Sequence, residues 1–346
     1  MENRLKKLRE KIKDYDGIII SNPINAKYFT GITSSNITLF ITKKESFLFT
    51  DFRYKELAQI NSAGFEVVWE NNAFANLCDC VSDKKSILIE TDYITYDYYS
   101  RLTEKFPSHA FIPTKNIISD LRIIKDATEL EYIKKACEIA DNAYAKTLPL
   151  VKEGMTELEL KSILEYNMKV NPSFDTIVLF GSNTSLPHGQ PSDRKLKNND
   201  IILMDFGSLV GGYGSDMTRT IFFGKLSSER KKAYDTVLEA HKLAVAKIEE
   251  NLKCSEADKE ARDYINNCGY VGCFGHSLGH GIGLDLHELP YLSEKSENIF
   301  KENMTFTIEP GIYIENQFGI RIENSYCLSS SGLISMTSSD KNITII

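Results

Sequence analysis

The chain has 346 residues, of which 42% are hydrophobic and 26% are charged, a composition typical of a soluble enzyme large enough for two domains. Its formal net charge of −7 offers no basic surface, so we expect no nucleic-acid partner. The first residues, MENRLKKLREKIKDYDG, lack the apolar core of a signal peptide, and no later apolar run approaches the length of a membrane span. We therefore expect a cytoplasmic protein without a membrane partner.

The seven cysteines form neither a zinc-binding nor a redox pattern. Two pairs are close in sequence, Cys78 with Cys80 and Cys268 with Cys273, and neither has the C-x-x-C spacing of such sites. We expect all seven to be reduced packing residues, as in proteins of a reducing compartment, and none to be catalytic.

Short apolar runs alternate with helical patterns through the first 120 residues. The apolar runs are YDGIIIS, ITLFITKKESFLFTD and SILIE, and the helical patterns are RYKELAQINSAG and YDYYSRLTEKF. This alternation predicts a small α/β domain. A boundary is expected within FIPTKNIISDLRIIKD, where a proline and polar residues precede a long helical pattern. We therefore divide the chain into domains at residues 1–121 and 122–346.

Two helices with capping boxes open the second domain. Thr128 and Glu131 have the spacing of a capping box at the start of the first helix. Apolar residues then recur at helical spacing: Ile133, Ala136, Ile139, Ala140 and Ala143. Thr156 and Glu159 have the same spacing at the start of the second helix, which should end before Pro172.

Further helices and strands follow in the second domain. Helical patterns cover residues 229–250 and 255–269. Four β-prone runs lie between and after them: DIILMDFGS, DMTRTIFFG, MTFTIEPGIYI and GIRIENSYCL.

Acidic residues stand at matching positions in the predicted hairpin IILMDFGSLVGGYGSDMTRTIFF. Its glycine-rich turn is centred near Val210 and Gly211, and Asp205 and Asp216 lie at equal distances from that centre. A symmetric hairpin would place the two carboxylates opposite each other. Such a pair destabilises a sheet, so we expect a cation between them.

A second hairpin, FTIEPGIYIENQFGIRIEN, repeats this arrangement. Glu309 and Glu323 lie at equal distances from Asn316. The alternative is that both hairpins carry exposed acids on the surface of a sheet. The apolar neighbours favour buried strands instead: Ile202, Met204, Phe206, Phe306, Ile308 and Ile322. Buried carboxylates without partners are very costly, which again points to bound cations.

Three of the six histidines stand in HSLGHGIGLDLHELP, residues 276–290. The glycines of this segment disfavour a helix and so exclude the helical zinc motif that the spacing of His276 and His280 would otherwise fit. In an extended segment side chains alternate, so His280 and His287 should point to different sides unless the glycines bend the chain. We expect different roles for them, with His280 as a metal ligand.

Four carboxylates and one imidazole match the charge of two divalent cations. Ligation dominated by oxygen suits manganese, cobalt or iron better than structural zinc, so we expect Mn²⁺ first, with Co²⁺, Fe²⁺ or Zn²⁺ as alternatives. Two such ions would lie roughly 3.5 to 4 Å apart, hold a bridging hydroxide and polarise a carbonyl group.

Five fragments together resemble the pita-bread metallopeptidases, the family of Xaa-Pro aminopeptidases, prolidases and methionine aminopeptidases. In order and spacing they are PHG, MDFG…SDMTRT, HSLGHGIGLDLHE, TIEPGIY and GIRIEN. The first 120 residues resemble the creatinase-type N-terminal domain of the proline-specific branch, by pattern more than by motif. The resemblance implies an α/β (α+β) fold, in which a small creatinase-type domain precedes a pita-bread catalytic domain.

The resemblance also assigns the metal ligands. It implies a site of Asp205, Asp216, His280, Glu309 and Glu323, in which Asp216 and Glu323 bridge the two ions. Glu309 would in addition act as the general base.

Further residues of the pocket follow from the same resemblance. His188 and His287 would donate hydrogen bonds to the substrate and to the tetrahedral intermediate, with His276 in the same pocket. Tyr313 and Arg321 stand where family members have a tyrosine and an arginine near the substrate and the metal carboxylates.

The implied function is that of a manganese- or cobalt-dependent exopeptidase, which hydrolyses the bond before a proline at the second position of a peptide. The alternative on the same scaffold is an Xaa-Pro dipeptidase. A methionine aminopeptidase is disfavoured by the preceding domain, and a creatine-hydrolysing relative by the metal-binding acids. A non-catalytic peptide-binding module would have lost the ligands that this chain retains. The family usually assembles through its N-terminal domain, so we expect a homodimer.

The segment HELPYLS favours the aminopeptidase over the dipeptidase. A dipeptidase must bind the free carboxylate that follows proline, and a buried carboxylate needs a cation, preferably arginine. Some microbial prolidases that resemble this chain have an arginine shortly after the H-E-x-P segment, where this chain has Tyr291. We therefore expect Tyr291 to contact substrate, and peptides of three or more residues to be cleaved faster than dipeptides.

Overall fold

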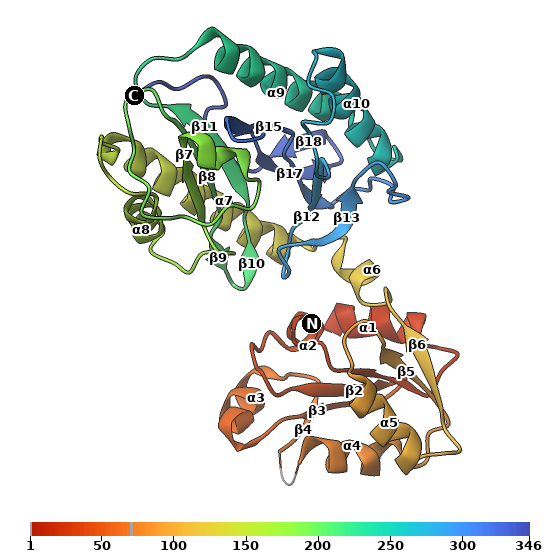
Figure 1. The fold of residues 1–346 in the computed structure, drawn as a ribbon. Helices are drawn as coiled ribbons and strands as arrows, with labels where there is room; N and C mark the ends of the chain where they lie inside the picture. The colour runs from red at the N-terminus through yellow and green to blue at the C-terminus, as the bar shows by residue number, and fades with distance from the viewer. Residues whose placement is uncertain (1, 70–71) are drawn as a thin grey trace. The chain divides into compact units, whose positions relative to one another are not determined.

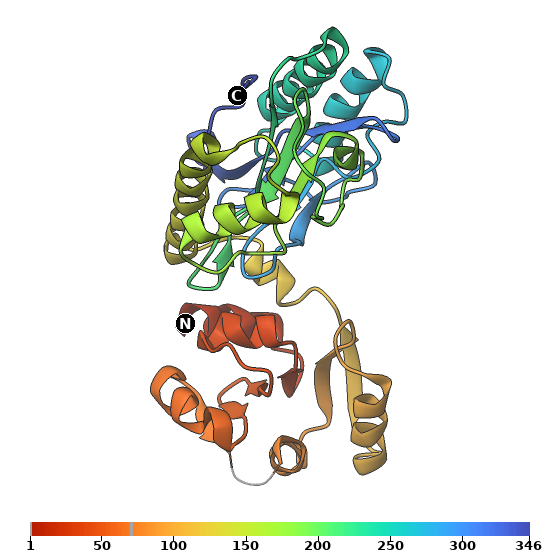
Figure 2. The same cartoon turned by 60° about the vertical axis from the view of Figure 1, so that its left-hand side comes forward.

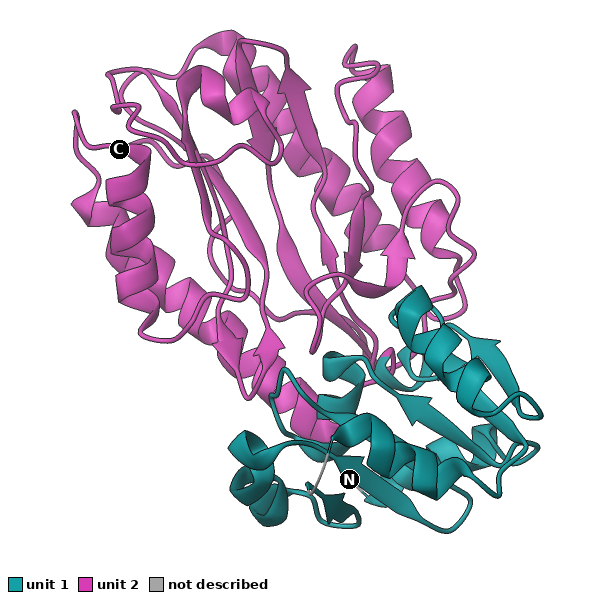
Figure 3. Ribbon diagram, turned by 60° about the horizontal axis from the view of Figure 1, so that its bottom comes forward, with its two compact units in different colours: residues 1–122 teal, residues 123–346 magenta. Residues whose placement is uncertain are grey.

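The computed structural model describes residues 2–69 and 72–346. It divides into two compact units, Met1–Arg122 and Ile123–Ile346, which Figure 3 colours separately. Each unit combines a sheet with helices and has its own hydrophobic core, which confirms the predicted α/β (α+β) class (Figure 1). All seven cysteines are free, as predicted. Within the described part of the chain, we find no helix that is both long and apolar enough to span a membrane.

The first unit is built on a six-stranded mixed sheet in the order β4-β3-β2-β1-β5-β6. The strands are β1 (Gly17–Ile20), β2 (Thr38–Thr42), β3 (Ser46–Phe49), β4 (Glu66–Val68), β5 (Ser86–Glu90) and β6 (Ala110–Thr114). The helices are α1 (Glu2–Lys11), α2 (Pro23–Thr30), η1 (Phe52–Tyr54), α3 (Lys55–Asn61), α4 (Ala73–Val81), α5 (Tyr96–Lys105) and α6 (Ser119–Arg122). The apolar runs predicted from the sequence form β1, β2, β3 and β5. The central strand β1 is buried throughout, as expected for a strand covered on both faces.

The helices described in the second unit are α7 (Ala127–Thr147), η2 (Leu148–Leu150), α8 (Glu157–Met168), η3 (Gly181–Ser185), α9 (Ser228–Lys247) and α10 (Cys254–Asn267). Three of them, α7, α8 and α9, begin at side-chain caps. The capping box of α8 is formed by Thr156 and Glu159, as predicted. The box predicted for α7 was wrong, because Asp126 and Glu129 form it and the helix has already begun at Thr128. Aspartate accepts amide hydrogen bonds at least as well as threonine, so the earlier cap prevails.

The strands of the second unit form two main sheets and two short ribbons. A three-stranded sheet has the order β11-β8-β7, and a five-stranded sheet has the order β13-β12-β14-β17-β18. The strands are β7 (Ile177–Phe180), β8 (Ile201–Phe206), β9 (Leu209–Val210), β10 (Tyr213–Gly214), β11 (Met217–Phe222), β12 (Gly279–Gly281), β13 (Glu288–Leu292), β14 (Thr305–Ile308), β15 (Gly311–Ile314), β16 (Phe318–Arg321), β17 (Asn324–Ser329) and β18 (Gly332–Ser335). Helices α7 and α8 pack against the smaller sheet, and α9 and α10 pack against strands β14 to β17 (Figure 2).

The first acid-bearing hairpin has a different register from the one predicted. Asp205 pairs with Thr218, and Asp216 lies just before β11. The turn is centred on Gly211 and Gly212, whose φ angles are +59° and +90°. A tight hairpin turn requires positive φ at both central residues, which the two glycines accept and a valine does not. The centre therefore moves one residue along the chain, and the pairing moves by two.

The second hairpin has the predicted register. Strands β14 and β17 pair Ile308 with Asn324, while β15 and β16 pair Gly311 with Arg321. Glu309 and Glu323 lie at matching positions in the short gap between these two ladders.

Candidate active site

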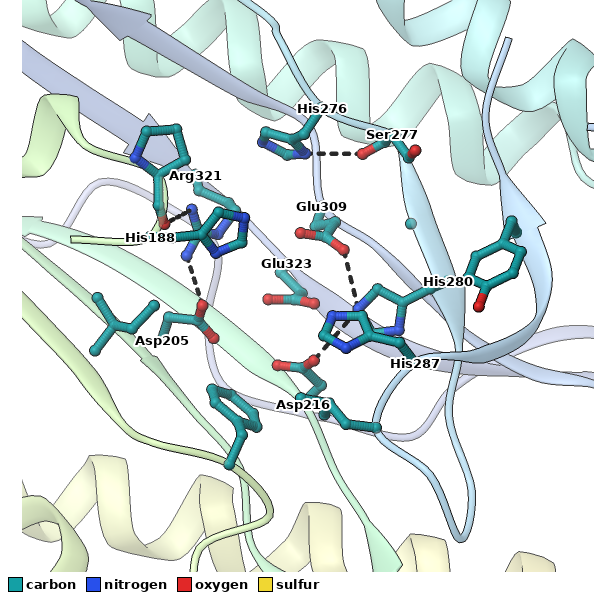
Figure 4. A pocket seen from close by; sticks show the side chains of 16 residues that line it. His188, Asp205, Asp216, His276, Ser277, His280, His287, Glu309, Arg321 and Glu323 are labelled. Atoms are coloured by element: carbon teal, nitrogen blue, oxygen red, sulfur yellow. Dashed lines mark hydrogen bonds and ion pairs between the residues drawn. The ribbon is translucent and has the colours of Figure 1, made fainter. Parts of the chain in front are cut away.

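A cavity of about 270 Å³ in the second unit is lined by all five predicted metal ligands (Figure 4). Asp205 comes from β8, Asp216 from the residue just before β11 and His280 from β12. Glu309 and Glu323 come from the gap in the second hairpin. Strands distant in sequence thus bring one imidazole and four carboxylates together.

His280 lies among these acids. Its Nε2 is 3.6 Å from Asp216 Oδ2 and 3.3 Å from Glu309 Oε1. One ligand atom each of Asp216, His280 and Glu323 lies within 4.8 Å of the others. Figure 4 shows the side chains of all five residues converging on the same space.

The tautomer of His280 suits a metal ligand. Its Nδ1 lies 3.2 Å from the carbonyl oxygen of Gly281, which can only accept, so Nδ1 carries the proton. The unprotonated Nε2 therefore faces the carboxylates. Burial lowers the pKa of His280 to about 4, which keeps the ring neutral near neutral pH.

Three carboxylate oxygens of the site are buried without a hydrogen-bond partner among the described residues. They are Asp205 Oδ1, Asp216 Oδ1 and Glu323 Oε1. Burial, with the charges of the neighbouring acids, raises the pKa of Asp216 and of Glu323 well above the usual range. Burial likewise raises the pKa of Glu309 to about 8. Unpartnered oxygens and mutual repulsion are what divalent cations would relieve, so these residues fit a metal centre.

Two threonines orient the glutamates. Thr218 Oγ1 donates to Glu323 Oε2 at 2.6 Å, and Thr307 Oγ1 donates to Glu309 Oε1 at 3.1 Å. The sequence analysis did not identify either threonine, although both stand within the motifs that carry the acids.

Arg321 links Asp205 to two further predicted pocket residues. It donates to Asp205 Oδ2 at 2.6 Å and to the Tyr313 hydroxyl at 2.7 Å. His276 Nδ1 lies 2.8 Å from the carbonyl of Ser277 and must donate to it, so His276 Nε2 accepts from the Tyr313 hydroxyl at 3.0 Å. Burial raises the pKa of Tyr313 to about 12, which keeps that hydroxyl protonated. The ring nitrogens of His276 are thus engaged within the protein.

The glycine-rich segment bends as its composition allowed. Strand β12 is extended at His280, and a bulge follows it before the loop that carries His287. The bend brings the two rings together, with centroids 4.2 Å apart. An unbent strand would have pointed the side chains of His280 and His287 to opposite sides, and the structure does not show this arrangement.

Three predicted substrate contacts line the cavity and are exposed. They are His188, His287 and Tyr291. Arg321 also donates to the carbonyl oxygen of Pro187, which fixes the segment that carries His188. Burial lowers the pKa of His287, so the imidazole stays neutral at pH values where an ordinary histidine is already protonated.

The structure adds an apolar wall that the sequence analysis missed. Phe174, Ile177, Pro187 and Leu286 line the same cavity. The sequence holds no signal for it, because apolar residues in strands and loops are ordinary core residues until the fold places them beside a polar site.

Comparisons with known proteins agree with this site. The model of the metallopeptidase family M24 matches residues 131–330, and that of the creatinase/prolidase N-terminal domain matches residues 4–124. An Xaa-Pro dipeptidase from Pyrococcus furiosus is 35% identical over 350 residues, which cover 99% of this chain and 100% of the relative.

Two solved structures are similar along their whole length. An Xaa-Pro dipeptidase from Bacillus anthracis has a TM-score of 0.96 and 36% identity, covering 100% of this chain and 99% of the other. An X-Pro aminopeptidase from Thermotoga maritima has a TM-score of 0.90 and 35% identity, covering 98% and 99%. The chain therefore belongs to the M24 metallopeptidases with the pita-bread fold, and its first unit is their creatinase/prolidase N-terminal domain.

Proposed function

We propose that the protein hydrolyses the bond between a first residue and a following proline, with Xaa-Pro dipeptides as its main substrates. The carboxylate oxygens without partners beside His280 carry the assignment to metal-dependent hydrolysis. The relatives from Pyrococcus furiosus and Bacillus anthracis, both named Xaa-Pro dipeptidase, support the dipeptide specificity. This revises the preference for longer peptides expected from the sequence.

We assign the metal centre to Asp205, Asp216, His280, Glu309 and Glu323, with two divalent ions and Mn²⁺ as the first candidate. The family resemblance assigns Asp216 and Glu323 to both ions; each has a buried oxygen without a partner among the described residues, as Asp205 also does. Bound ions of this kind polarise a carbonyl group and lower the pKa of water.

Glu309 is the proton acceptor in this proposal. Its Oε1 accepts the Thr307 hydroxyl, which leaves Oε2 to take up a proton. Its raised pKa, about 8 without metal, shows how strongly the site favours a proton on this carboxylate.

His188 and His287 orient the substrate and donate hydrogen bonds to the developing charge. Both rings are exposed at the cavity, as a contact with a bound peptide requires. A donor already aimed at that charge stabilises the transition state without reorganisation. The wall of Phe174, Ile177 and Leu286 excludes water and offers apolar contacts to a proline ring.

A second candidate, Xaa-Pro aminopeptidase, is favoured by the charges of the cavity. Among the described lining residues, Arg321 is the one arginine or lysine, and it already pairs with Asp205. Tyr291, 45% exposed, cannot neutralise the free carboxylate of a dipeptide.

Kinetics after reconstitution with Mn²⁺ decide between the two. We expect a higher kcat/KM for Xaa-Pro dipeptides than for Xaa-Pro-Yaa peptides with the same first residue. A higher kcat/KM for the longer peptides, together with faster dipeptide hydrolysis by the Tyr291→Arg variant, would identify the protein as an Xaa-Pro aminopeptidase. The homodimer and the cytoplasmic location stay predictions, and light scattering at assay concentration tests the first.

A further inference from the structure

A buried ion pair lies beneath the loop that carries His287. Lys125 Nζ is 2.7 Å from Glu288 Oε1, and the side chains are 1% and 7% exposed. Glu288 begins β13, directly after His287. Neither residue lines the cavity or belongs to the proposed metal ligands.

The Glu288 carboxylate contacts the middle of this loop, residues 282–287. Its Oε2 accepts from the backbone N–H of Asp285 at 3.3 Å. It also lies against Gly283, where an added Cβ would be only 2.4 Å from Oε1. The backbone of Glu288 pairs with Gly281 across β12 and β13, so the residue that closes the loop also reaches its middle with its carboxylate.

Lys125 is fixed from outside the loop. Its backbone N–H donates to the carbonyl of Asn303 at 2.9 Å, and it directly precedes Asp126, the cap of α7. Its Nζ also lies 3.4 Å from the carbonyl oxygen of Ile123. The ammonium group therefore anchors the Glu288 carboxylate, and with it the loop, to the start of the catalytic unit.

We propose that Lys125 is a positioning residue that acts through Glu288 to hold His287 in the cavity. This inference rests on the proposed role of His287 in Xaa-Pro hydrolysis. A catalytic side chain must be held within about 0.5 Å of its productive position, and a loop of six residues needs an external anchor to achieve this.

A double-mutant cycle with His287 tests the proposal. We expect Lys125→Met to lower kcat about 10- to 100-fold, with a smaller change in KM, since a misplaced group loses about that much. In the His287→Ala background, Lys125→Met should change kcat less than twofold, because the residue through which it acts is already absent. Losses that multiply in the double variant would overturn the proposal.

Two further variants keep a loss of folding apart from a loss of positioning. Replacing both partners of a buried ion pair with apolar residues is often neutral for stability, so Lys125→Met with Glu288→Met replaces the single variant in the cycle if that one unfolds. Lys135→Met removes the same charge from the exposed Lys135–Glu131 pair in the same unit and should leave kcat within twofold. An equal loss in Lys135→Met would overturn the proposal.

Hydrogen exchange provides a readout that does not depend on activity. In Lys125→Met, amides of residues 283–288 should exchange at least tenfold faster, while amides of α8 keep the wild-type rate. Unchanged exchange in the loop would overturn the anchoring role even if kcat fell. Wild-type protein that binds Mn²⁺ but cleaves no Xaa-Pro substrate would instead refute the proposed function and leave the exchange test intact.

Discussion

At the scale of single residues, the site gathers groups that are each unfavourable alone. Asp216 and Glu323 are buried carboxylates with unpartnered oxygens, and His280 is a neutral imidazole whose free nitrogen faces them. A bound cation would satisfy the unpartnered oxygens of both carboxylates and the free nitrogen of the imidazole. An ordinary buried ion pair does not bring three such groups together.

Substitution of the assigned ligands should abolish activity. We expect Asp205→Asn and Glu309→Gln to lower kcat by several orders of magnitude, because each weakens metal binding and the second removes the proton acceptor. Activity assays with metal analysis check this. If either variant kept its metal content and its turnover, the assignment of that residue would fail.

The exposed histidines should behave differently from the ligands. His188→Ala and His287→Ala are expected to keep their metal content but to lose about 10²- to 10³-fold in kcat, the effect of removing one donor to developing charge. Metal analysis of both purified variants separates the roles. Metal loss in one of them would make that histidine a ligand.

At the scale of elements, the hairpins show what the sequence could predict. The second register was predictable because the polar turn around Asn316 is symmetric between the paired strands. The predicted register of the first hairpin was wrong by two residues, because apolar alternation does not locate a turn. The structure places the turn at Gly211 and Gly212, which have positive φ angles. The acids still reached one cavity, since a pairing shift of two residues keeps side chains on the same sheet face.

The turn glycine gives a test of this explanation. Gly211→Ala should destabilise the fold by about 1 to 2 kcal/mol through its positive φ, and by more because the new Cβ would lie 2.9 Å from the Tyr132 ring. Gly272→Ala is the matched control, since its φ is +77° and nothing lies within 4 Å of an added Cβ. Denaturant unfolding should show a larger loss for Gly211→Ala. Equal losses would mean that the Tyr132 contact contributes nothing.

At the scale of the whole molecule, relatives match both units along nearly the full chain. The α/β class and the four acids assigned to the metal followed from patterns in the sequence. The apolar wall and the Lys125–Glu288 pair did not, because each depends on contacts between segments far apart in sequence. The preferred substrate length stays a prediction, because Tyr291 is a single position of a pocket built from many segments.

The buried carboxylates should make the metal-free protein less stable as pH rises. Glu309 has a pKa raised from 4.5 to about 8 in the folded state, so folded protein binds more protons than unfolded protein between those values. Its contribution to the free energy of unfolding is therefore fully present below pH 4.5 and is lost as pH rises through about 8, and the raised pKa values of Asp216 and Glu323 act in the same direction. Bound Mn²⁺ replaces those protons, so the gain in Tm on adding Mn²⁺ should increase from pH 5 to pH 8. Thermal melts with and without Mn²⁺ at both pH values measure this gain. His276 and His280, whose pKa values burial lowers to about 3 and about 4, act in the opposite direction below pH 6.5, so Glu309→Gln is measured beside the wild type. An equal change of the metal-free Tm from pH 5 to pH 8 in both proteins would show that Glu309 does not hold a proton in the folded site.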